Sequence, residues 1–367
     1  MNTAASTSTP RGFQNVWLVA EREVGSKLRS RAFVISTVIT LLIALAAVIW
    51  GGFSAGNPSA TKVAVTSSTA AAVEKVPGVE VTQVADQDAA EALVRSGEVS
   101  AAVVDDASSP TGLVVIAEDS PPTSLLMGLS ESPSVKLLDP ATVDFALRYF
   151  VSIGFGVVFL LAASLFGGTI AQSVVEEKQT RVVELLLSAM PARTLLAGKI
   201  IGNTILAMAQ ILLLATIAVV GLIVTGQSEV LQGLGAPIAW FAIFFLFGFV
   251  LLASLFAAAG SLVSRMEDIG STTAPLTMLI MAPYFLVIFF NDNPVVLTVM
   301  SYVPFSAPVG MPLRLYLGEA QWWEPILSLV ILIATCVAAI VLAAKIYERS
   351  ILRMGARVSW REALKTP

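Results

Sequence analysis

Residues 149–175 read YFVSIGFGVVFLLAASLFGGTIAQSVV and contain no charged side chain. A helix needs about 20 apolar residues to cross a bilayer core roughly 30 Å thick, and this run is long enough to do so. Further uncharged runs of similar length lie along the chain. Together they predict a polytopic α-helical membrane protein with six transmembrane helices, near residues 32–52, 149–172, 200–224, 237–263, 270–290 and 325–345.

The composition agrees with a membrane protein. Of the 367 residues, 56% are hydrophobic and 13% are charged, against about 25% charged residues in soluble domains. The net charge of −4 excludes a broadly basic nucleic-acid binder. The chain has no His and a single Cys, Cys336, which excludes Ser-His-Asp catalysis, His-bound zinc and an internal disulfide. We therefore expect no catalytic residue, no metal and no nucleic-acid partner.

The distribution of Lys and Arg predicts the orientation. These residues gather before the first predicted span, in the loops 173–199 and 264–270, and after the last span. Because basic residues favour the cytosolic side, both termini of this multi-pass protein are expected in the cytosol, at the cell membrane. Residues 1–31 are expected to form a cytosolic tail with an amphipathic surface helix, and 347–367 a basic cytosolic tail. A cleaved signal peptide is disfavoured, because the charged segment before the first apolar block is too long.

Residues 53–148 form the one sizeable polar region of the sequence. A helix is expected over 88–98, where DAAEALVRSGE carries a glycine near its end. This pattern predicts a small extracytoplasmic α/β domain between the first two transmembrane helices. Its strands are expected in four short runs, at 62–68, 79–86, 100–106 and 112–119.

The loop 173–199 reads SVVEEKQTRVVELLLSAMPARTLLAGK and has a charged face and an apolar face. We predict a short amphipathic cytosolic helix within 174–192, followed by a turn at Pro191. This helix either caps the bundle at the membrane surface or docks a cytosolic partner. Gly198 and Gly202 form a small-xxx-small pair, which predicts close packing between helices.

A seventh uncharged run, 293–313, contains four prolines. Because proline breaks a helix, residues 293–320 are expected to form a bent or re-entrant outer segment within the membrane region 149–346. A seventh crossing would also place the basic tail outside, against the distribution of Lys and Arg.

The energy source of this protein is expected on another chain. No Asp, Glu, Lys or Arg lies within the six predicted spans, which weighs against an ion-coupled transporter or a proton relay. The phosphate-binding motif G-x-x-x-x-G-K-[ST] is absent. The predicted cytosolic segments are also too short for a nucleotide-binding domain, which typically needs at least about 50 residues.

Three stretches resemble the permease subunit of type-2 ABC exporters, in the NatB-like branch: EEKQTRVVELLLSAMPARTLLAGKIIG (176–202), SRMEDIGSTTAPLTMLIMAPYF (264–285) and YVPFSAPVGMPLRLYLGE (302–319). The resemblance implies that the first stretch is a coupling helix that docks into a cytosolic ATPase. By this resemblance, the residues facing the ATPase are Glu176, Glu177, Arg181 and Glu184, with a second contact from Arg265, Glu267 and Asp268. The outer hairpin that helps to close the pathway would contain Pro304, Phe305, Pro308, Met311 and Arg314.

The resemblance implies a permease subunit of an ATP-driven exporter that is not itself an enzyme. ATP and Mg²⁺ would bind on the partner ATPase, present in two copies, and this chain would bind no cofactor. A second permease chain, identical or related, would complete the pathway, with membrane lipid around it. The alternative is a membrane-anchored sensor or assembly protein whose extracytoplasmic domain binds a ligand. An intramembrane enzyme is disfavoured, because no set of catalytic polar residues is recognisable.

Overall fold

The computed structural model describes residues 11–56, 61–76, 78–106, 109, 112–117, 123–129, 145–353 and 362–363. Contacts divide the chain into two units. The membrane unit comprises residues 1–49 and 141–367, and the α/β unit comprises residues 50–140.

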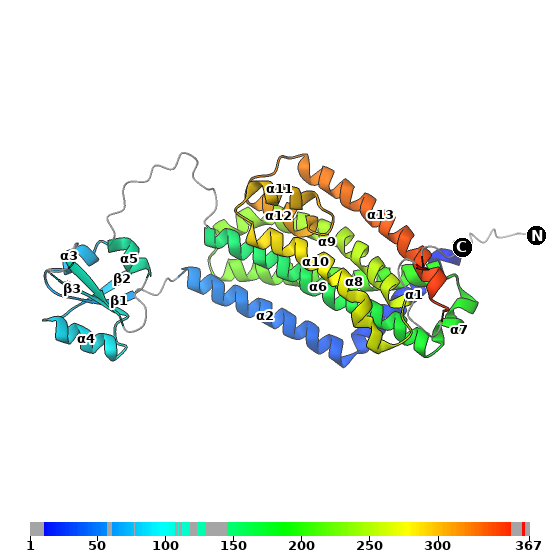
Figure 1. The fold of residues 1–367 in the computed structure, drawn as a ribbon, viewed down its shortest axis with the longest axis horizontal. Coiled ribbons are helices and arrows are strands. Elements are labelled where there is room, and N and C mark those ends of the chain that lie inside the picture. Colours follow the sequence, from blue (N-terminus) through cyan, green and yellow to red (C-terminus); the bar gives the residue numbers. More distant parts are fainter. Residues whose placement is uncertain are drawn as a thin grey trace, which may run out of the picture. The chain divides into compact units, whose positions relative to one another are not determined.

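Six helices among the described residues are long and apolar enough to cross a membrane. In the membrane unit they run alongside one another (Figure 1). The central helix is α9, which packs against α6, α8, α10 and α13 and buries Phe244, Phe245 and Phe249. Phe245 meets Phe159 of α6 edge to face, and Phe249 meets Phe166 of α6 in the same way. The bounds of the six helices are α2 (Arg31–Gly56), α6 (Phe145–Gln179), α8 (Ala192–Val224), α9 (Ser228–Ser261), α10 (Ile269–Phe289) and α13 (Glu324–Ser350).

Helices α6 and α8 extend well beyond the uncharged runs that predicted them. The α6 helix continues through Glu176, Glu177 and Lys178, and α8 begins before Lys199. The expected spans 149–172 and 200–224 carry no charged residue, but each is only part of a longer helix that also carries charged residues beyond the span. An uncharged run marks only the part of a helix suited to hydrocarbon, whereas Glu, Lys and Gln are good helix formers that allow the same helix to continue.

The helix predicted over 174–192 is shorter in the structure. The α6 helix takes up its first part, and α7 (Val182–Ala189) is a separate short helix. Arg181 separates them with φ 60°, in the left-handed region that turns the chain sharply. Pro191 then precedes α8 with extended backbone, as expected for a residue that cannot continue a helix. The loop after α9 contains the short 3₁₀ helix η1 (Met266–Asp268).

Two short helices, α11 (Pro294–Tyr302) and α12 (Ala307–Tyr316), form a hairpin between α10 and α13. The prolines explain its shape. Pro294 occupies the first turn of α11, where its missing N–H is not needed, and Asn293 caps that end by accepting from the N–H groups of Val295 and Val296. Each helix has ten residues or fewer, which is too short to span a bilayer.

The α/β unit contains a four-stranded sheet in the order β2-β1-β3-β4. β1 pairs in parallel with β2 and β3, whereas β4 is antiparallel to β3. Val63, Val65 and Val103 form part of its core, and the predicted strands and helix are all present. The bounds are β1 (Thr61–Val65), α3 (Ala70–Val73), β2 (Val79–Gln83), α4 (Gln87–Arg95), β3 (Ala101–Asp105), β4 (Leu113–Ile116) and α5 (Thr123–Leu129).

Candidate functional site

The N-terminal helix α1 (Arg11–Arg29) packs closely against the first turns of α8. Val19 and Ala20 are buried in this contact. A Cβ atom at Gly198 would lie 2.4 Å from the Val19 Cβ, and one at Gly202 would lie 2.8 Å from the Ala20 carbonyl oxygen. The predicted glycine pair thus permits a close helix contact, and its partner is α1, which the sequence did not indicate.

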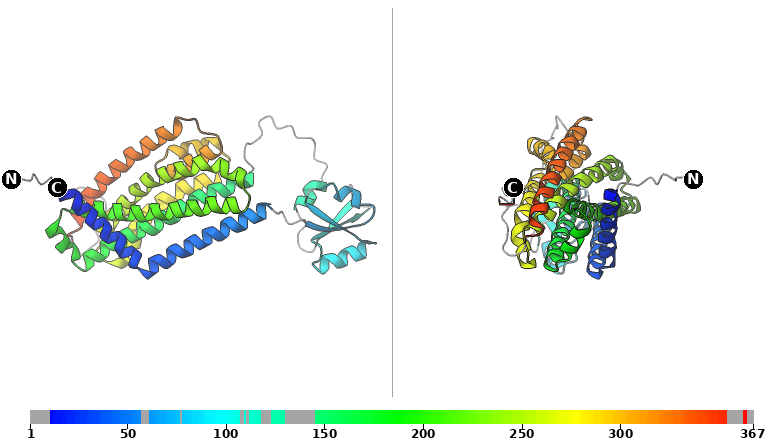
Figure 2. Two further views of the ribbon diagram at one scale, coloured as in Figure 1. Left: turned by 180° about the vertical axis from the view of Figure 1, so that it is seen from behind. Right: turned by 90° about the vertical axis from the view of Figure 1, so that its right-hand side faces the viewer.

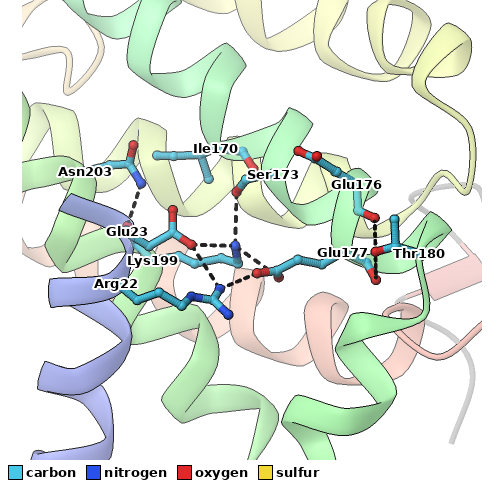
Figure 3. Close-up of polar contacts among 9 residues, drawn as sticks. All are labelled: Arg22, Glu23, Ile170, Ser173, Glu176, Glu177, Thr180, Lys199 and Asn203. Carbon is cyan, nitrogen blue, oxygen red and sulfur yellow. Dashed lines mark hydrogen bonds and ion pairs between the residues drawn. The ribbon is translucent and has the colours of Figure 1, made fainter. Parts of the chain in front are cut away.

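A buried ion cluster joins α1, α6 and α8 beside this contact (Figure 3). The Lys199 ammonium is completely buried and lies 2.9 Å from a carboxylate oxygen of Glu23 and 3.0 Å from one of Glu177. It also donates to the Ser173 hydroxyl over 3.0 Å. Arg22 forms ion pairs with both carboxylates. We call Arg22, Glu23, Glu177 and Lys199 the ion cluster; its two positive and two negative charges balance.

The ion cluster changes the titration of Glu23. Burial alone would raise the pKa of this carboxyl, but the Lys199 ammonium and the Arg22 guanidinium outweigh that effect and hold the pKa below its ordinary value of 4.5. The carboxylate is therefore charged at neutral pH and stabilises the docked position of α1.

This shift predicts a dependence of stability on pH. Because Glu23 binds its proton more weakly in the folded chain, its contribution is fully present above its ordinary pKa of 4.5 and is lost as the pH falls below that value. We expect the Tm of the detergent-purified protein to fall on acidification more steeply in the wild type than in Glu23→Gln. Melting curves at a series of pH values check this, and parallel acid dependence in both proteins would contradict it.

Lys178, the neighbour of Glu177, connects the same end of α6 to other helices. Its buried ammonium donates to the Ser261 carbonyl at the end of α9 over 2.7 Å and to the Ser350 carbonyl at the end of α13 over 2.9 Å. Carbonyls at a helix C-terminus carry partial negative charge and lack intrahelical partners, so a cation there is favourable. Consecutive residues of α6 thus hold α1 and α8 through Glu177, and α9 and α13 through Lys178.

The residues that the family resemblance assigned to ATPase docking do not share one exposed helix face. Glu176 is exposed at the end of α6, whereas the side chain of Glu177 is only 13% exposed and belongs to the ion cluster. Arg181 and Glu184 are exposed at the start of α7. The same short helix exposes 73% of Leu185 while burying Val183. The exposed surface here therefore consists of α7 and the residues flanking it.

The second predicted docking segment lies in and beside η1. Arg265 and Glu267 are exposed and form an ion pair of 3.3 Å with each other, and Asp268 is half-buried. Both η1 and α7 contact α6.

The predicted outer-gate residues lie in the α11–α12 hairpin, and most are held firmly. Pro308, Met311 and Arg314 are buried, and Pro304 and Phe305 are half-buried. The Arg314 guanidinium lies 2.8 Å from a carboxylate oxygen of Glu324 in α13 and donates to the Ser301 hydroxyl of α11 over 3.0 Å. Arg314 therefore clamps the hairpin to the start of α13, and its gating role stays a prediction.

Among the described residues, no group of three His, Cys, Asp or Glu side chains comes together to hold a metal ion. Sequence reasoning missed the functional pairing of Arg22, Glu23, Lys178 and Lys199. In the sequence, the available signal was that Lys199 directly follows Gly198 of the helix-packing pair, but its partner Glu23 lies far away along the chain.

The sequence profile of ABC-2 family transporter proteins matches residues 31–345. The uncharacterised protein YhaP of Bacillus subtilis is 30% identical over 210 residues, which cover 54% of this chain and 50% of YhaP. The uncharacterised protein MJ1024 of Methanocaldococcus jannaschii is 30% identical over 222 residues, covering 60% of this chain and 54% of MJ1024. The chain thus matches about half the length of each relative.

Proposed function

The chain belongs to the ABC-2 family of transporter proteins, and on this premise we propose that it is the membrane-spanning permease subunit of an ATP-driven exporter. A separate cytosolic ATPase chain docks on α7 and on the neighbouring η1 segment, and ATP and Mg²⁺ bind on that chain. The protein itself is a transport subunit of the cell membrane, with both termini in the cytosol. The observation that carries this proposal is the exposed α7 helix at the end of α6, in a chain of this family.

The contacts of α6 support a coupling role for α7. A displacement of α7 would move α6, because only the tight turn at Arg181 separates the two helices. The ion pairs of Glu177 link α6 to α1 and α8, and the hydrogen bonds of Lys178 link it to α9 and α13. Because these links are buried and charged, they resist separation, so the helices would move together. ATP-driven motion of the docked subunit would shift the pathway between its two states in this way.

A pair of permease chains would form the pathway, each with its own ATPase subunit. A symmetric dimer is the commonest closed assembly. The α2 helix exposes apolar side chains along its length, among them Ile35, Ile39 and Ile43, which suit contact with lipid or with a second permease chain. The NatB-like branch and export as the direction of transport rest on the resemblance of 176–202, 264–285 and 302–319.

A second candidate function is a membrane-anchored sensor, and one feature of the α/β unit favours it. Ser68 follows strand β1, Asp105 is the last residue of the parallel strand β3, and the Ser68 hydroxyl donates to the Asp105 carboxylate at the carboxyl edge of these strands. In open α/β sheets this edge is the usual place for ligands. A sensor would keep its function in cells that lack the ATPase, whereas the permease would lose all transport.

Charge reversal on α7 tests the docking proposal. We expect Arg181→Glu and Glu184→Lys each to weaken binding of the ATPase about tenfold, which corresponds to about 1.4 kcal/mol, because both side chains lie exposed beside Leu185. The measurement is recovery of an ABC-type ATPase with the tagged chain from its native host, followed by stimulated ATP hydrolysis by the purified complex.

Matched reversals on the α/β unit serve as controls. Lys62→Glu and Glu80→Lys change equally exposed side chains that the proposed topology places on the other side of the membrane. They are expected to leave ATPase binding unchanged. Docking on α7 would be ruled out if both α7 variants bound the ATPase and stimulated ATP hydrolysis normally. It would also be ruled out if the control variants lost as much ATPase binding as the α7 variants.

A further inference from the structure

An open polar pocket of about 320 Å³ lies beside the ion cluster, between α1 and α6. Besides members of the ion cluster, the lining includes the hydroxyls of Ser26, Ser30 and Ser173 and the charged groups of Lys27 and Glu176.

Lys27 and Glu176 face this pocket from opposite helices. Within the described part of the chain, neither side chain forms an ion pair or a hydrogen bond. Lys27 is half-buried, and burial lowers the pKa of its ammonium despite the attraction of Glu23 and Glu176. Beside the ion cluster, whose own charges balance, the pocket therefore presents the Lys27 ammonium on the α1 side and the Glu176 carboxylate on the α6 side.

The pocket lies at the level where the membrane-spanning region begins. Ser26, Lys27 and Ser30 come directly before α2, whose apolar span begins at Arg31. The α1 and α2 helices meet at a sharp angle (Figure 2). The α1 helix also exposes large apolar side chains, which is typical of a helix lying in the membrane interface: Phe13, Trp17, Leu18 and Leu28. On the proposed membrane topology, the pocket therefore lies next to the headgroup layer.

We propose that this pocket binds the headgroup of a zwitterionic phospholipid with a primary ammonium, phosphatidylethanolamine. Lys27 receives the phosphate, with the hydroxyls of Ser26 and Ser30 as further donors, and Glu176 receives the ammonium. A purely anionic headgroup would leave Glu176 without a cation and would be repelled by it. A quaternary ammonium has no N–H group to donate to that carboxylate, so phosphatidylcholine would bind more weakly.

Lipid retention by the purified chain tests this proposal without any ATPase, so its failure is distinguishable from failure of the docking proposal. The chain in detergent is mixed with phosphatidylethanolamine, phosphatidylcholine or phosphatidylglycerol of identical acyl chains, and bound lipid is counted by native mass spectrometry. We expect phosphatidylethanolamine to bind about tenfold more tightly than either of the others. Lys27→Gln and Glu176→Gln should each remove most of that preference, and Glu176→Gln should also improve binding of the anionic lipid.

Arg29→Gln and Glu21→Gln are the matched controls, because both side chains are exposed on α1 outside the pocket lining. They are expected to keep the preference. A melting curve for each variant verifies that it is folded before lipid is counted. Equal retention of the three lipids by the wild type, or an unchanged preference in both pocket variants, would overturn the proposal.

Discussion

Replacing Lys199 with methionine is expected to lower the free energy of unfolding by about 3–5 kcal/mol, the range for breaking a buried ion pair. Methionine keeps the length of the side chain but removes the ammonium. The carboxylates of Glu23 and Glu177 would then remain largely buried, with side chains only 7% and 13% exposed, and among the described residues Arg22 would be the one cation left in ion pairs with them. Thermal unfolding in detergent measures the change.

The control is Arg193→Met on the same helix. Arg193 pairs with Glu348, but 73% of its side chain is exposed, so water replaces the lost partner and little change in Tm is expected. Adding Glu23→Gln and Glu177→Gln to Lys199→Met should recover part of the lost free energy of unfolding, because the triple variant no longer buries the unpaired carboxylates. Equal melting temperatures for Lys199→Met and Arg193→Met would show that the ion cluster contributes nothing to stability.

Substituting Gly202 with valine is expected to force α1 away from α8. The new Cβ would lie 2.8 Å from the Ala20 carbonyl oxygen and 3.2 Å from the Ala20 Cα. Both are backbone atoms of α1, so no side-chain rotation relieves the clash. Overpacking of this kind costs about 1–3 kcal/mol. Because Glu23 lies in the next turn of α1, displacement would also weaken its ion pair with Lys199.

Faster proteolysis of α1 and a lower Tm are the expected results for Gly202→Val. The control is Gly154→Val in α6, where a Cβ atom meets nothing within 4 Å, so the same change in helix propensity occurs without a clash. Equal protease resistance of α1 in the two variants would mean that the helices tolerate separation at Gly202, and that α1 is not held by close packing there.

These two experiments concern the same end of the membrane unit as the docking proposal. The ion cluster and the glycine contact hold α1 on α8, and Glu177 links both to α6. If α7 receives the ATPase, loss of either contact should reduce coupling as well as stability. We expect Gly202→Val to bind the ATPase normally, because α7 itself is unchanged. The same variant should stimulate ATP hydrolysis less than the wild type does.

Much of the architecture could be predicted from local patterns. The uncharged runs located six helices suited to span a membrane, and four short runs of strand character located β1 to β4. The prolines of 293–313 indicated a broken segment, where α11 and α12 lie. In each case the signal is contained within one continuous segment, because apolar length, strand propensity and the missing N–H of proline are properties of the local chain.

The limits of α6 and α8 and the partners of their charged residues depended on the tertiary structure. The family resemblance assigned both Glu176 and Glu177 to the docking surface, yet Glu177 lies inside the ion cluster with Lys199 and Arg22. A charge in a sequence has no fixed partner until folding removes the water around it and brings an opposite charge within reach, and only then is its burial tolerated. The amino-acid sequence by itself thus determined the membrane spans and the α/β unit, whereas the packing of α1 on α8 decided which charges are buried and which remain available to a ligand.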